Sequence, residues 1–157
     1  DIPINTRQQL VIQAGPRLGT PEPVNIAAAQ PAIFTNGSGS EGMIFRIRDG
    51  VADPVTVANP ASEGDTILIH SSGLGGVTGT VQAGQAPPAP APATVNPVSV
   101  SLGGISVPAD FAGLSPDTPG VYHVRAAVPA GVQKGDAVPV VLTTAGQTSP
   151  AVTMAIR

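Results

Sequence analysis

The sequence predicts an all-β fold, a sandwich or barrel of short strands, and three observations lead to this class. Runs of alternating apolar and polar residues recur along the chain. Clusters of turn residues separate these runs, and the 157 residues include 19 glycines and 18 prolines. No window of 12 residues free of glycine and proline shows a helical stripe of apolar side chains. Short strands joined by turns rich in glycine and proline are typical of sandwiches and barrels.

The clearest element is a hairpin over residues 98–107. Val98, Val100 and Leu102 alternate with serines, and a second alternating run begins at Ile105. Gly103 and Gly104 lie between the runs, and both tolerate the positive φ that a tight hairpin turn needs. By the same alternation, the sequence predicts strands at 43–48, 53–58, 65–71, 98–102, 105–107, 121–128, 138–144 and 152–156.

The alternation also assigns side chains to the two faces of these strands. In 121–128, Tyr122 and Val124 point one way, and His123 and Arg125 point the other way. Phe45 and Tyr122 share a face with aliphatic residues, so we expect both rings to fill the core.

Composition excludes several functional classes. Charged residues make up 11% of the chain, against about 25% in an average soluble protein. The net charge of −3 and the scattered basic residues give no nucleic-acid footprint. No apolar run approaches the roughly 18 residues of a membrane span. A secretory signal is also absent, so we expect a mature, trimmed or partial chain.

Residues 82–97, QAGQAPPAPAPATVNP, interrupt the strand pattern. Alternating proline and alanine favours an extended, polyproline-like path. Such a segment is either a linker between domains or a long loop within one sandwich. Neither flanking piece has enough expected strands for a sandwich of its own, so we favour an exposed loop inside a single domain at 32–157.

Residues 1–31 resemble the end of an earlier unit. Segment 7–27 aligns with 138–155, with Ala14-Gly15 over Ala145-Gly146 and three extra residues in the earlier turn. Each copy is expected to form a hairpin around its Ala-Gly turn. A lone hairpin is marginal in water, so this one is expected to pair with the following domain, an upstream domain or another chain.

Three stretches carry a resemblance to a known family: residues 112–122, Val128-Pro129-Ala130-Gly131 and Gly135-Asp136-Ala137-Val138-Pro139. With the segments around them, they resemble an uncharacterised C-terminal domain family of Solibacter-type Acidobacteria. That family is similar to IPT/TIG immunoglobulin-like domains. The resemblance implies an immunoglobulin-like β-sandwich exported from the cell, and it implies no catalytic activity.

The residues that could carry chemistry are few. His70 and His123 invite a metal or triad hypothesis, but their spacing matches no ligand motif. Asp49 and Asp53 flank a turn and supply two carboxylates, whereas calcium needs six to eight oxygens. Gly73-Leu74-Gly75-Gly76 lacks the last glycine and the helix of a dinucleotide loop. We therefore expect no enzyme, no catalytic residues, no metal and no cofactor.

The function that fits best is a structural or adhesive module of a secreted or cell-surface protein. Its expected partners are copies of itself or neighbouring domains, through strand donation by the N-terminal segment into a fibre. The candidate assembly interface is formed by apolar residues of that segment: Leu10, Val11, Ile12, Val24 and Ile26. The alternative is a carbohydrate- or ligand-binding module, which the four aromatic side chains disfavour.

Overall fold

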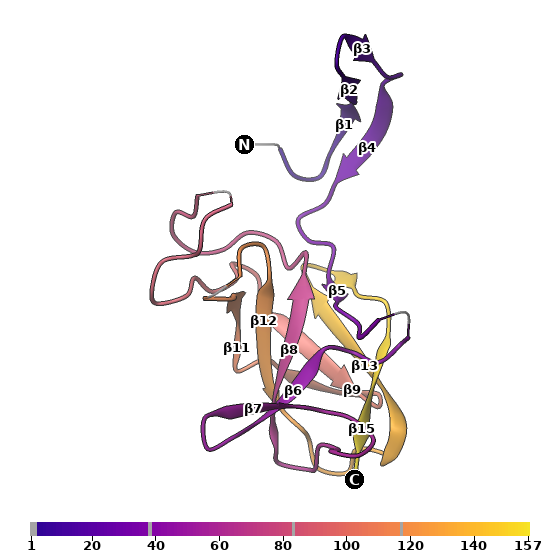
Figure 1. Cartoon of the computed structure of the whole chain (residues 1–157), viewed down its shortest axis with the longest axis vertical. Helices are drawn as coiled ribbons and strands as arrows, with labels where there is room; N and C mark the ends of the chain where they lie inside the picture. The colour runs from indigo at the N-terminus through magenta and orange to yellow at the C-terminus, as the bar shows by residue number, and fades with distance from the viewer. Residues whose placement is uncertain (1–2, 38, 83, 117) are drawn as a thin grey trace.

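The fold is all-β, as the alternation predicts. A computed structural model describes residues 3–37, 39–82, 84–116 and 118–157, and none of these residues is helical. Two large antiparallel sheets face each other, and a narrow hairpin extends from them at the N-terminal end (Figure 1). The described residues contain no helix long and apolar enough to cross a membrane.

The first large sheet has six strands, all antiparallel to their neighbours. Its order is β11-β12-β8-β6-β7, and the short β5 lies beside β6 on the same edge of β8. The strands are β5 (Ala32–Ile33), β6 (Ile44–Arg48), β7 (Val51–Pro54), β8 (Thr66–Ser72), β11 (Phe111–Leu114) and β12 (Tyr122–Ala127).

The second large sheet has five strands around the long β13. Its order is β10-β9-β13, and both β14 and β15 pair with the far edge of β13. The strands are β9 (Val98–Leu102), β10 (Ile105–Pro108), β13 (Gly135–Thr144), β14 (Gln147–Thr148) and β15 (Val152–Ile156).

The core lies between the two sheets and is aliphatic. Ile67, Ile69 and Val124 enter it from the six-stranded sheet, and Val100 and Leu142 enter it from the five-stranded sheet. All five side chains are inaccessible to solvent. One continuous core beneath both sheets makes the body of the chain a β-sandwich.

The turns of two predicted hairpins have the positive φ angles that tight hairpin turns need. Gly103 and Gly104 have φ of 56° and 90° and connect β9 to β10. Ala145 and Gly146, with φ of 48° and 74°, connect β13 to β14. Two successive residues with positive φ suit the twist of the flanking strands.

Two expectations about strands and faces are wrong, and one strand was missed. The predicted strand 53–58 is β7, which spans Val51–Pro54, and the chain then turns so that Val55 is buried. Phe45 does not fill the core: it lies on the outer face of β6, while Ile44 and Arg46 on that strand are buried. Strand β11 was not expected, because its FAGL sequence is too short to alternate recognisably.

The Pro/Ala-rich segment 82–97 connects strands that belong to one sandwich, because β8 before it pairs with β12 after it. Its last part runs along the edge of β11. The amide of Leu114 donates to the carbonyl of Pro92, and the amide of Thr94 donates to the carbonyl of Ala112. A Cβ on Gly113 would lie 2.4 Å from the Pro92 oxygen, so glycine permits this close approach. The loop therefore covers an edge that would otherwise be open.

The N-terminal hairpin forms its own small sheets. Strands β1 (Thr6–Leu10) and β4 (Glu22–Ile26) pair along five residues, and β2 (Gln13–Ala14) pairs with β3 (Arg17–Leu18) at the tip. Among the described residues, no residue of this hairpin pairs with either large sheet. Residues 27–31 connect it to the sandwich, where the amide of Gln30 donates to the carbonyl of Gly73.

Candidate functional site

One face of the N-terminal hairpin carries four aliphatic side chains and has no core beneath it; Thr6, Gln8 and Glu22 lie on the same face. Leu10 is 51% exposed and Ile12 is 68% exposed. Val24 and Ile26 lie on the same face as Leu10, because they pair with Gln8 and Thr6 in the β1–β4 register. Four of the five predicted interface residues therefore share one face. Val11 is the exception, since its side chain points to the opposite face and its exposure is 42%.

The opposite face of the hairpin is polar. Arg7, Gln9, Pro23 and Asn25 alternate with the apolar residues and are all exposed. An isolated two-stranded ribbon has no layer to pack on, so its apolar side chains remain in contact with water. This amphipathic ribbon has the side-chain pattern of a strand pair that packs on a second layer.

A second cluster lies on the outer face of the six-stranded sheet. His70 on β8 and His123 on β12 are direct cross-strand partners, and their rings stack with centroids 4.6 Å apart. The Phe45 ring lies 4.8 Å from the His70 ring. Three half-buried rings from β6, β8 and β12 thus form a row. The sequence did not reveal this row, because 53 positions separate the histidines and only the β8–β12 register joins them.

Burial shapes the acid–base behaviour of this row. Desolvation lowers the pKa of His70 from its ordinary value of 6.5. Neighbouring rings cover His70 from β6 and β12, and the nearest cation on the same face of β12 is Arg125. The partly buried surroundings of His70 therefore favour its neutral form.

We expect the sandwich to lose stability as the pH falls below 6.5. The unfolded chain binds the His70 proton more tightly than the folded chain does, so folding is penalised in that range. The stabilising contribution is complete above pH 6.5 and disappears as the pH falls toward the lowered pKa of folded His70. Thermal unfolding of the chain and of His70→Gln between pH 8 and pH 5 tests this. A variant with the same pH slope as the parent would contradict the assignment.

The surroundings of the two histidines do not form a metal site within the described part of the chain. In the described residues, no three side chains of histidine, cysteine, aspartate or glutamate come close enough together to hold a metal ion. Ser71 is buried on the inner face of β8, and its hydroxyl donates to the Tyr122 carbonyl at 3.4 Å. Successive strand residues point to opposite faces, so Ser71 and His70 do not meet.

The glycine-rich segment after β8 is a packed turn. Gly73 has φ of 71°, and a Cβ there would lie 1.9 Å from the Gln30 carbonyl oxygen. Gly75 similarly faces the Ala28 carbonyl, and it accepts a hydrogen bond from the Tyr122 hydroxyl at 2.6 Å. Burial raises the pKa of that hydroxyl above its ordinary value of 10.0. These glycines bring the turn against the connecting segment 27–31, a structural role.

A charged cluster lies where β6 and β8 meet the loop 59–65. The Arg46 guanidinium donates to the Pro60 carbonyl at 2.6 Å and to the Asn59 side-chain oxygen at 2.7 Å. It also lies 3.9 Å from an Asp65 carboxylate oxygen, and Arg48 approaches the same carboxylate at 3.2 Å. These contacts hold the loop against the sheet, although the buried Nε of Arg46 has no hydrogen-bond partner.

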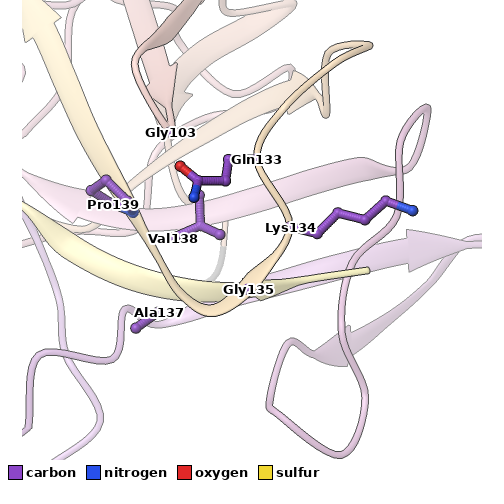
Figure 2. A pocket seen from close by; sticks show the side chains of 7 residues that line it. All are labelled: Gly103, Gln133, Lys134, Gly135, Ala137, Val138 and Pro139. Atoms are coloured by element: carbon purple, nitrogen blue, oxygen red, sulfur yellow. The ribbon is translucent and has the colours of Figure 1, made fainter.

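A small hollow lies beside the start of β13. Its volume is about 200 Å³, and Gln133, Val138 and Pro139 are among the residues that line it. Figure 2 shows the side chains of Lys134 and Ala137 pointing away from Gln133 and Val138. Ligand pockets are typically larger and contain several converging polar groups. This hollow therefore lacks the features of a ligand pocket, whereas the hairpin face presents exposed apolar side chains and the ring row presents half-buried rings.

Comparison with known proteins adds no assignment: no family model matches the chain, and no curated protein or solved structure matches it either.

Proposed function

We propose that this chain is a non-enzymatic structural or adhesive module of a secreted or cell-surface protein, joined to a neighbouring β-domain through its N-terminal hairpin. The observation that carries this proposal is the exposed apolar face of residues 6–26 described above. Strand addition combines main-chain hydrogen bonds with burial of alternate side chains, which this ribbon offers on its edges and on one face.

An immunoglobulin-like sandwich, as in the Solibacter-type family that the sequence resembles, is part of the proposal. Leaving out the β6–β7 hairpin, the order β5-β8-β12-β11 corresponds to strands A-B-E-D of that fold. The order β9-β13-β15 corresponds to strands C-F-G. Such domains occur in many cell-surface proteins, which supports an extracellular structural role.

A direct test compares the whole chain with a version beginning at Ala28, which keeps the buried Ala29 and the Gln30–Gly73 hydrogen bond. We expect the whole chain to associate at high concentration through its exposed hairpin faces, and the shortened chain to remain monomeric. Size-exclusion chromatography with light scattering and negative-stain microscopy measure this. Both chains should unfold at nearly the same temperature, because the hairpin does not pair with the sandwich.

Identical monomeric behaviour of both chains at every concentration would contradict self-association. The polar-face variant Gln9→Asp and the apolar-face variant Ile12→Asp form a matched pair for this test, because both positions are exposed in the monomer. Only Ile12→Asp is expected to weaken association.

The ring row favours a second candidate function, a carbohydrate- or ligand-binding module. Phe45, His70 and His123 present a partly exposed stacking surface on one face of the six-stranded sheet. Apolar faces of sugars stack on such rings. A glycan array with the whole chain and with Phe45→Ala tests this function, and an array without hits for the whole chain would remove it.

A further inference from the structure

The N-terminal hairpin repeats the register of the C-terminal hairpin of the sandwich. In β1–β4, the cross-strand pairs include Gln8↔Val24, Gln9↔Pro23 and Leu10↔Glu22. In β13–β15, the corresponding pairs are Val138↔Met154, Pro139↔Thr153 and Val140↔Val152. Each residue of the second set follows its counterpart by 130 positions, so these pairs correspond without a gap. Beyond them the registers differ, because β13 shifts between Gly135 and Val138 whereas β1 pairs regularly as far as Thr6↔Ile26.

The tips of the two hairpins also correspond at an offset of 130 positions. The pairs Gln13↔Leu18 and Ala14↔Arg17 correspond to Thr143↔Thr148 and Thr144↔Gln147. The amide of Gly19 donates to the Ile12 carbonyl at 2.8 Å, and the amide of Ser149 donates to the Leu142 carbonyl at the same distance.

This correspondence corrects the alignment made from the sequence. Gly15 and Pro16 form the centre of the first turn, as Ala145 and Gly146 form the centre of the second turn. The sequence alignment placed Ala14-Gly15 there, one residue too early, and it needed three extra residues that the structure does not require.

The apolar face of the hairpin corresponds to core positions of the sandwich. Leu10, Ile12, Val24 and Ile26 take the places of Val140, Leu142, Met154 and Ile156, which are all at most 1% exposed. Val11 takes the place of Val141, on the other face. The same alternating pattern therefore places four aliphatic side chains on the open face of the hairpin and their four counterparts in the core of the sandwich.

We infer that residues 6–26 are the terminal hairpin of another sandwich, and that their partner is a β-sandwich of the same build as residues 29–157 whose place for this hairpin is unfilled. The inference deepens the proposed function and rests on it. In the sandwich, β13 pairs with β9, for example Leu142 with Val100, and β15 contacts the chain at Glu41 and Ala61. The partner accordingly presents a β9-like edge to β1 and a short segment to β4.

The two edges of the hairpin differ in the main-chain hydrogen bonds that they can form with a partner. The Ile12 carbonyl bonds within the hairpin, so the main-chain groups of Val11 point outward, toward the β9-like edge. On the other edge, Pro23 takes the place of Thr153, whose amide donates to the Ser40 carbonyl. Proline has no such donor. The β9-like edge of the partner is therefore the main attachment.

A tandem fusion tests this inference with the whole described chain from residue 6 onward. Residues 29–135 are followed directly by residues 6–157, so that the hairpin falls where residues 136–156 normally lie. We expect two folded sandwiches, with a molar unfolding enthalpy close to twice that of the single chain by calorimetry. Brief trypsin treatment should leave the fusion intact. Digestion of the first copy both in this fusion and in the valine-substituted fusion below, leaving only the single-chain product, would overturn the inference.

Side-chain variants of the fusion test whether the hairpin packs in the first sandwich copy in the proposed register. Ile12→Asp should unfold the first copy, whereas Gln9→Asp should not, and equal effects would contradict the proposed register. A second fusion carries Gln8→Val and Glu22→Val, which restore the aliphatic residues found at Val138 and Val152. If that fusion also leaves its first copy unfolded, the inference fails. Association of the whole chain that is lost on removing the hairpin would then still support the proposed function, with a different partner.

Discussion

Truncating Leu142 to alanine is expected to lower the free energy of unfolding by about 2–5 kcal/mol. The same truncation at Ile12 is expected to change it by no more than about 0.5 kcal/mol. The two residues hold corresponding positions in hairpins of the same register, but Leu142 is fully buried and Ile12 is 68% exposed. Deleting buried methyl groups loses their transfer free energy and leaves a cavity, and both costs are small where water already reaches the side chain.

Urea unfolding of the two variants measures this contrast. The single chain and the tandem fusion should give different results for Ile12→Ala, since the fusion is designed to bury Ile12. A loss at Ile12 in the single chain as large as the loss at Leu142 would show that the hairpin already packs on the sandwich. That result would contradict the exposed apolar face on which the proposed function rests.

Replacing Arg46 with alanine is expected to destabilise the sandwich by about 1.5–3 kcal/mol, the cost of losing hydrogen bonds to a charged group. The Arg46 side chain is only 10% exposed, and its guanidinium satisfies both the Pro60 carbonyl and the Asn59 side-chain oxygen. Without it, two acceptors lose a charged donor and the Asp65 carboxylate loses one of its two cations. The loop 59–65 should loosen first, because these contacts hold it against β6.

Arg48 provides the matched control on the same strand. It approaches the same Asp65 carboxylate at 3.2 Å, but its side chain is 52% exposed. Exposed ion pairs contribute about 0–1 kcal/mol, so Arg48→Ala should have a small effect. Denaturant unfolding of both variants, with amide hydrogen exchange of residues 59–65, measures the difference. Equal losses of unfolding free energy in the two variants would show that burial of the arginine does not determine how much its removal destabilises the sandwich.

The predicted site and the observed surfaces overlap only in part. Alternation placed Leu10, Ile12, Val24 and Ile26 as apolar residues in need of cover, and the structure leaves them on one open face. The ring row escaped prediction, because the meeting of His70 and His123 depends on the pairing of β8 with β12. Phe45 was assigned to the wrong face, since a run of mixed residues such as MIFRIR alternates ambiguously.

The sequence alone determined the class of the fold and several of its turns. Glycine pairs and period-two alternation act over a few residues, so 98–107 could be predicted as a hairpin without knowing what packs on it. The tertiary structure decided the rest, because those features depend on contacts between distant segments. Strand β11 exists beside Pro92 and Thr94, Arg46 is buried beneath a loop 13 residues away, and the terminal hairpins share a register that sequence identity had placed one residue off.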